Sequence, residues 1–214
     1  MKPREISHIA LAVVLLTLVA GLQFAIKSQW NQLIYAFAFS TIIIVVAVMS
    51  KKFVAYLLDA DIEHEIWHTS AYGLKKSQHF KKPVPAGLII PLLISIVTLG
   101  QVKFSALLTY EARALKYRSS KRFGFYSFKE ITDWHHALIG GASTIALLIL
   151  ASFAYLFPQI NLEYFAKLSV YYAFWNLLPL SKLDGAQIFF GSRILWSVLA
   201  TITSVAVILS IITV

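Results

Sequence analysis

The sequence has no cysteine and few charged residues, and each scarcity excludes a class of protein. Without cysteine the chain can form no disulfide and can carry out no thiolate chemistry. Charged residues make up only 14% of the 214 residues, whereas 58% are hydrophobic. A typical soluble domain carries about 25% charged residues. The composition therefore excludes an ordinary soluble protein and indicates a membrane protein.

Long runs without charge predict membrane-spanning helices. A span needs about 20 residues, because the hydrocarbon core is about 30 Å thick and a helix rises about 1.5 Å per residue. The windows without any Lys, Arg, Asp or Glu are 9–26, 31–50, 137–157 and 194–214. Three further windows are apolar but contain charges or helix breakers: 53–74, 83–102 and 163–183. The expected fold is an all-α polytopic bundle of about six transmembrane helices, with a re-entrant or hairpin segment near 83–102.

The net charge of +9 arises mainly from basic residues in short loops between the apolar runs. This arrangement predicts orientation in a lipid bilayer, and no nucleic-acid partner is expected. The loops 75–82 and 111–136 are the richest in Lys and Arg, so both should face the cytoplasm. If 9–26 and 31–50 each cross the membrane, the N-terminus lies outside, together with Lys51 and Lys52.

The most informative stretch is DIEHEIWHTS, residues 61–70, which concentrates ionisable side chains in an apolar chain. Residues 64–68 form an HExxH pattern, and on a helix His64 and His68 would lie one turn apart on the same face. Two such imidazoles can bind one metal ion, and Glu65 can act as general base on its water. Asp61 could orient an imidazole from behind. The alternative is an interfacial helix whose polar residues face water.

A catalytic zinc site needs a third protein ligand, and no local extension of the HExxH pattern supplies one. The segment NLLPLSKLDGAQ, residues 176–187, breaks an apolar window at Pro179 and places Asp184 next to Gly185. A carboxylate on a kinked segment can face inward. An ordinary helix cap is the alternative role for Asp184. The distant candidates for the third ligand are Glu111, Asp133, His135, His136 and Asp184.

Together, HEIWH at 64–68 and NLLPLSKLDG at 176–185 resemble the two signature segments of the site-2 protease family of intramembrane zinc metalloproteases. The resemblance covers about residues 53–196. It implies one Zn²⁺ per chain, held by His64, His68 and Asp184, with Glu65 as general base. It also implies that Asn176 positions the substrate backbone or the oxyanion. The chain departs from the family pattern at Trp67, at Gly140–Gly141 and at Ser181–Lys182, where Lys182 could pair with Asp184.

The resemblance predicts a zinc-dependent endopeptidase that cleaves a membrane protein or peptide in or near its transmembrane segment. Residues 1–214 are expected to form one membrane-embedded domain without an appended regulatory domain: two accessory helices in 1–50, a catalytic core in 53–196 and a C-terminal helix in 194–214. A prokaryotic cell membrane is the expected location, with the active site nearer the cytoplasm. The alternatives are an inactive relative that binds a metal or a membrane partner, an ion transporter, and a prenyl-protein type of protease.

Overall fold

The computed structural model describes residues 2–71, 79–115, 131–157 and 162–212. Four helices in these ranges are long and apolar enough to cross a membrane: α1 (Pro3–Ile26), α2 (Trp30–Leu57), α4 (Asp133–Leu156) and α7 (Arg193–Ile212). The shorter helices are α3 (Ala86–Val97), α5 (Glu163–Asn176) and α6 (Asp184–Gly191). The strands are β1 (Ala60–Ile66), β2 (Thr69–Ala71), β3 (His79–Val84) and β4 (Leu108–Ala114). By helix length and composition, the chain is a polytopic membrane protein.

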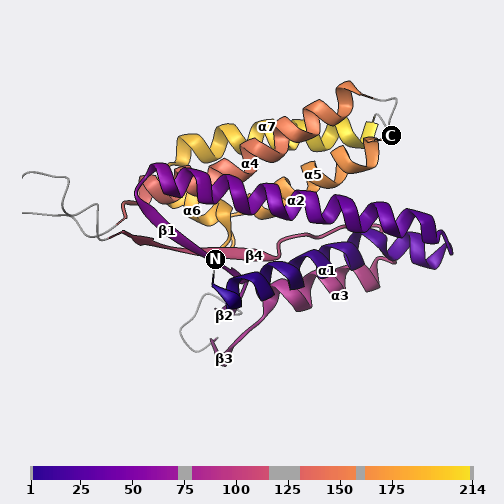
Figure 1. The fold of residues 1–214 in the computed structure, drawn as a ribbon, viewed down its shortest axis with the longest axis horizontal. Coiled ribbons are helices and arrows are strands. Elements are labelled where there is room, and N and C mark those ends of the chain that lie inside the picture. The colour runs from indigo at the N-terminus through magenta and orange to yellow at the C-terminus, as the bar shows by residue number, and fades with distance from the viewer. Residues whose placement is uncertain (1, 72–78, 116–130, 158–161, 213–214) are drawn as a thin grey trace, which may run out of the picture.

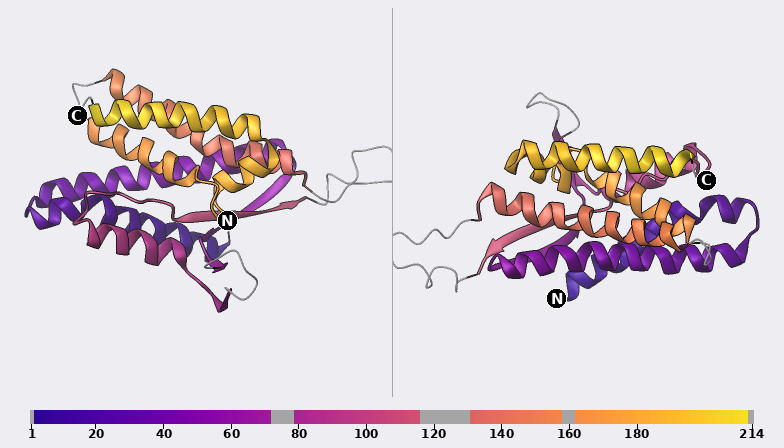
Figure 2. Two further views of the ribbon diagram at one scale, coloured as in Figure 1. Left: turned by 180° about the vertical axis from the view of Figure 1, so that it is seen from behind. Right: turned by 90° about the horizontal axis from the view of Figure 1, so that it is seen from above.

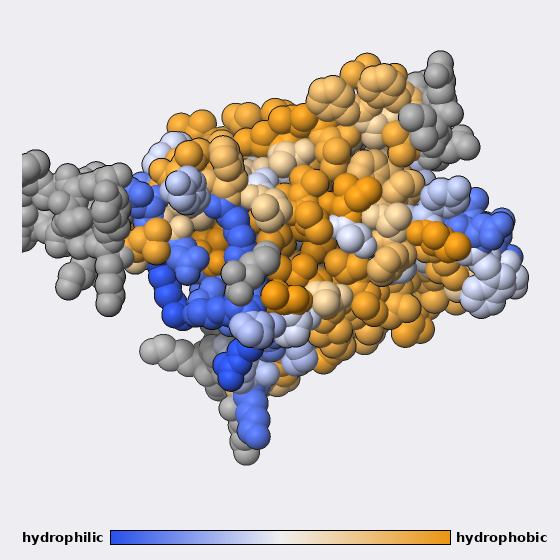
Figure 3. Space-filling view, in the orientation of Figure 1, coloured by the Kyte–Doolittle hydropathy of each residue, from blue (hydrophilic) through white to orange (hydrophobic). Residues whose placement is uncertain are grey.

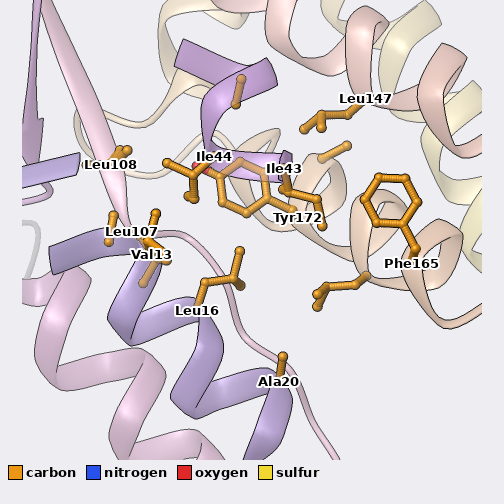
Figure 4. Close-up of a cluster of buried hydrophobic side chains, with 14 of the residues drawn as sticks. Val13, Leu16, Ala20, Ile43, Ile44, Leu107, Leu108, Leu147, Phe165 and Tyr172 are labelled. Atoms are coloured by element: carbon orange, nitrogen blue, oxygen red, sulfur yellow. The ribbon is translucent and has the colours of Figure 1, made fainter. Parts of the chain in front are cut away.

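The helices lie side by side along one axis, with α2 in the middle (Figures 1 and 2). Helix α2 contacts α1 on one side and α4 on the other, and α4 in turn packs against α5, α6 and α7. Leu16 of α1, Ile43 of α2 and Tyr172 of α5 are all fully or almost fully buried in the main hydrophobic cluster. Figure 4 shows these side chains meeting between the helices. This shared core joins the N-terminal hairpin to the C-terminal helices.

Two small antiparallel sheets gather at one end of the bundle. Strand β1 pairs with β4, with His64 opposite Tyr110, and β2 pairs with β3. Hydrophilic residues collect over this end, whereas an apolar surface covers the helices (Figure 3). We call this the sheet end. Such a division between polar end and apolar side is expected of a protein whose helices face lipid.

The expectation that every element is helical is wrong for the window 53–74. Helix α2 continues through this window only to Leu57, and the chain then forms β1. The sequence of β1, ADIEHEI, alternates between buried and less buried positions, with Ala60, Ile62, His64 and Ile66 on the buried face. A period of two indicates a strand and a period of 3.6 indicates a helix. The HExxH pattern therefore begins on a strand.

The window 83–102 forms a hairpin of one short helix and an extended return. Helix α3 has 12 residues and would measure about 18 Å. Leu99 and Gly100 both have positive φ, and a Cβ on Gly100 would lie 3.1 Å from the backbone nitrogen of Gln23, near the far end of α1. The chain then runs back to β4 at the sheet end (Figure 1). With α5 only 14 residues long, four of the expected six helices reach spanning length in the described part of the chain.

The N-terminus lies at the same end of the bundle as β3 and β4, the described parts of the two basic loops, so the expectation that it lies on the opposite side from these loops is wrong for the described residues. Lys2 pairs with Glu63 of β1, and Lys52 Nζ lies 2.7 Å from Glu5 Oε1. The expectation of opposite sides assumed that 53–74 crosses the membrane, and this segment instead stays at the sheet end as β1 and β2. Most of the loops 75–82 and 111–136 lies outside the described residues. Their described parts, in β3 and β4, are also at the sheet end (Figure 1).

Candidate functional site

His64, Glu65 and His68 come together around one polar cavity at the sheet end. This cavity, of about 390 Å³, lies between the start of α1 and β1 and is lined by all three residues. His64 is buried, Glu65 is exposed and His68 is half-buried just beyond the end of β1. Asp184 does not line this cavity. The three residues therefore border one cavity, but the strand directs the side chains of His64 and Glu65 to opposite faces and does not give the helical spacing that was expected.

The side chain that orients His64 is Glu5 of α1. Oε1 of Glu5 lies 3.1 Å from His64 Nδ1 and 3.3 Å from the His64 backbone nitrogen. Because a carboxylate only accepts hydrogen bonds, Nδ1 carries the ring proton. Asp61, which was expected to play this part, is exposed on β1 opposite Arg113. On a strand, positions three apart lie on opposite faces, so Asp61 points away from His64.

Burial and the nearby Lys51 ammonium together lower the pKa of His64 to about 4, although Glu5 opposes the shift. In the unfolded chain His64 therefore binds a proton near pH 6.5, whereas in the folded protein it binds one only near pH 4. We expect stability to be complete above about pH 6.5 and to fall by up to about 3 kcal/mol as the pH drops towards 4. Thermal unfolding in detergent across this pH range would measure the loss of stability. His64→Asn should flatten the dependence, whereas an equally steep curve in that variant would assign it to another group.

Asp184 forms a buried ion pair with a residue that the sequence interpretation left at the membrane surface. Lys51 Nζ of α2 lies 2.6 Å from Asp184 Oδ2, and both side chains are almost completely buried. Ser143 of α4 donates a hydrogen bond of 3.1 Å to the same carboxylate oxygen. Lys182, the expected partner, is exposed, and its Nζ lies 3.6 Å from Glu111 Oε1. The counterion of Asp184 is therefore Lys51.

The residues implied for zinc do not fit that metal in this arrangement. No group of three His, Asp or Glu side chains within the described ranges is placed to hold a metal ion. Asp184 Oδ2 already carries the Lys51 ammonium, and that positive charge also reaches His64, whose protonation it disfavours. A divalent cation beside the same ammonium would meet stronger repulsion. Coordination by His64, His68 and Asp184 would have to use Oδ1 of Asp184, which has no hydrogen-bond partner among the described residues, and would place the metal ion on the carboxylate that the Lys51 ammonium already neutralises.

Asn176 is buried and holds backbone. Its Nδ2 donates hydrogen bonds to Tyr172 O at 2.8 Å and to Ser105 O at 3.2 Å. Asn176 thereby ties the end of α5 to the extended segment that leads into β4. Its Oδ1 has no partner among the described residues. A role for Asn176 towards substrate or oxyanion stays a prediction.

A second cavity, of about 450 Å³, lies beside β4 and contains three of the distant ligand candidates. One wall is β4 from Tyr110 to Arg113, and the other comes from residues 181–182 and from α6. Glu111, Asp133 and His136 all line it. Gln187 of α6 connects the walls, because its Nε2 donates to Tyr110 O at 3.3 Å and its Oε1 lies 3.2 Å from His136 Nδ1. We call this space the β4 cavity.

Three residues that matter for these sites were not predicted as site residues from the sequence: Glu5, Lys51 and Gln187. Glu5 and Lys51 lie near the ends of apolar helices, where charged residues ordinarily reach water. One feature indicates that Lys51 lies within the helix and not at its end, because α2 continues beyond it for six residues, or about 9 Å. Only the packing of α2 against α4 and the ion pair with Asp184 of α6 show that its side chain turns inward. Gln187 carried no signal of its own.

Searches of protein-family models, of curated proteins and of solved structures found no match to this chain.

Proposed function

We propose that the chain is a membrane-embedded binding protein that holds an extended segment of a partner membrane protein along β4 without cutting it. The observation that carries this proposal is the outer edge of β4, which borders the β4 cavity. It corresponds to the inactive, partner-binding alternative that the sequence left open. The sheet end is proposed to face the cytoplasm, because β3 and β4, the described parts of the two loops richest in Lys and Arg, lie there.

The hydrogen-bond pattern of the sheet indicates which backbone groups of β4 are available. Trp67 N donates to Leu107 O at 2.9 Å, and Leu115 N donates to Asp59 O at 3.1 Å. In an antiparallel pair the residues alternate between bonding inward and pointing outward. Tyr110, Ala112 and Ala114 therefore direct their N–H and C=O groups away from β1. The bond from Gln187 to Tyr110 O agrees with this alternation.

An extended peptide can add to such an edge as a further strand, and main-chain hydrogen bonds then supply affinity. From Tyr110 to Ala114 the edge is about 13 Å long. The formal charges that line the cavity balance, since Arg113 and Lys182 are matched by Glu111 and Asp133, and both cations lie near Glu111, at 3.8 Å and 3.6 Å. A neutral rim favours recognition through the backbone over recognition of a charged side chain. The location beside apolar helices favours a segment that adjoins a partner's membrane span.

Ala112→Pro is the sharpest test, because it removes an outward N–H while leaving the inward bonds of β4 in place. Proline is tolerated on a strand where its nitrogen faces away from the ladder. A photoreactive residue at Arg113, in chain reconstituted in nanodiscs, should crosslink to single-span membrane proteins that carry extended tails. We expect Ala112→Pro to reduce crosslinking by about tenfold, the effect of losing roughly 1.4 kcal/mol. Ala112→Ser, which retains the N–H, should crosslink as the parent does.

A zinc-dependent intramembrane endopeptidase is the second candidate, and one observation favours it. His64 and His68 hold their Nδ1 protons in bonds to Glu5 and to Ile66 O, which leaves each Nε2 as the ligand atom. The same nanodisc panel separates the candidates if zinc content and cleavage products are measured. Zinc-dependent cleavage that Glu65→Gln abolishes would establish the enzyme. The absence of both crosslinking and cleavage across the panel would contradict the binding proposal.

A further inference from the structure

The ion pair of Lys51 and Asp184 stands where four separate elements meet. Lys51 comes from α2 and Asp184 begins α6, while Ser143 of α4 donates to the same carboxylate. The Lys51 ammonium also lies 5.2 Å from the centre of the Tyr110 ring of β4, within the range of a cation–π contact. Lys51 is 2% exposed and Asp184 is 0% exposed. Neither side chain is accessible to bulk water.

Two buried charges of opposite sign are tolerable only as a pair. A lone ion in an apolar interior loses its hydration and remains strongly unfavourable, whereas an adjacent counterion offsets much of that loss. Removal of one partner would leave the other charge stranded among the helices. Replacement of both partners by apolar side chains would leave no stranded charge, and in other proteins this change is often neutral.

The contact is too close for an intervening metal ion. An N–O distance of 2.6 Å is that of a direct charge-assisted hydrogen bond. Asp184 is also the residue on which the resemblance to zinc proteases depends. We propose that the Lys51 ammonium is the permanent cation of the Asp184 carboxylate, in place of zinc, so that this core is held together by an internal charge and needs no metal.

The pair has a positioning role as well as a stabilising one. Asp184 fixes the first turn of α6, and Gln187 follows three residues later on that helix. Gln187 then contacts both Tyr110 O and His136 Nδ1. Lys51 thereby acts, through Asp184, on one wall of the β4 cavity. This consequence holds whether or not a partner peptide binds there.

Metal dependence is the first test, made on the full chain purified in detergent. Elemental analysis should find substoichiometric zinc and other transition metals, and EDTA should shift the thermal unfolding midpoint by less than about 1 °C. Added Zn²⁺ should likewise leave the midpoint unchanged. A stoichiometric transition metal, or a midpoint that falls in EDTA, would overturn the proposal.

Charge coupling is the second test, by a double-mutant cycle in the same detergent. We expect Lys51→Met to lower the midpoint by about 10 °C, since it strands Asp184. The double variant Lys51→Met/Asp184→Leu should return to within about 3 °C of the parent. Lys182→Met is the matched control, because this lysine lies two residues from Asp184 but pairs elsewhere, and it should leave the midpoint unchanged.

The cycle remains decisive even if Lys51→Met alone yields no folded protein. A double variant that folds with a near-parental midpoint would then still establish the coupling. A single variant as stable as the parent, or a double variant as unstable as Lys51→Met or unable to fold, would refute it.

Discussion

Gly185→Ala should destabilise the protein by about 3 kcal/mol or more, although it adds only one methyl group. A Cβ at Gly185 would lie 1.9 Å from Leu177 O and 2.6 Å from Leu178 O. These obstacles are backbone atoms at the end of α5, which cannot turn aside as a flexible side chain can. Overpacking of a tight core ordinarily costs about 1–3 kcal/mol, and overlap with backbone belongs at or above the top of that range. Glycine is therefore required here for the close approach of α6 to the backbone of Leu177 and Leu178, directly after α5.

Gly141→Ala is the matched control on α4. Its nearest neighbour would be a Leu199 methyl carbon at 3.5 Å, which is ordinary van der Waals contact. Alanine also favours a helix over glycine by about 1 kcal/mol. Thermal unfolding of both variants in the same detergent should therefore show a large fall in the midpoint for Gly185→Ala and little change or a rise for Gly141→Ala. Equal midpoints for the two variants would mean that Gly185 lies farther from the backbone of Leu177 and Leu178 than these distances indicate.

Glu5→Ala should lower stability by about 3–5 kcal/mol, because this buried carboxylate serves two partners. Its oxygens lie 2.7 Å from Lys52 Nζ and 3.1 Å from His64 Nδ1, and its side chain is 3% exposed. Without it, the Lys52 charge and the His64 N–H lose their acceptor inside the protein. The start of α1 would also lose its anchor on β1. The free energy of unfolding, from denaturation of purified protein, measures the effect.

Glu63→Ala is the natural comparison, since it removes a second Lys–Glu pair at the same end of the molecule. Glu63 pairs with Lys2, whose side chain is 63% exposed. Exposed ion pairs contribute about 0–1 kcal/mol, because water and salt screen them. We therefore expect Glu63→Ala to change the free energy of unfolding far less than Glu5→Ala does. A comparable loss in both variants would indicate that Glu5 is solvated in the detergent-bound protein.

Long apolar windows were the strongest sequence signal, and the structure confirms helices in all four charge-free windows. A run of about 20 apolar residues has few alternatives, since lipid demands that every backbone group be bonded within the segment. The window 53–74 was misjudged because HExxH suggests a helix, whereas the alternation of ADIEHEI favours a strand. That alternation was visible in the sequence, but the motif outweighed it. The hairpin at 83–102, formed by α3 and an extended return, was indicated by the prolines and glycines of that window.

The candidate site depended on long-range contacts that no local pattern contains. Glu5 and His64 are 59 residues apart, and Lys51 and Asp184 are farther apart still. A carboxylate in an apolar segment predicts that some cation lies nearby, and a divalent metal and a lysine satisfy that requirement equally well. The motif favoured the metal. The packing of α2 and α6 against opposite sides of the same helix, α4, placed the lysine beside Asp184.

The sequence by itself determined that the chain is a membrane protein, where most of its helices lie, and that Asp184 is a candidate for an inward-facing carboxylate. These follow from composition and from the energetics of transfer into lipid, which depend on residue type and spacing alone. Only the tertiary structure decided that β1 is a strand, that Glu5 orients His64 and that Lys51 neutralises Asp184. The identity of a partner depends on which elements pack together, and that is fixed by the whole chain rather than by any one segment.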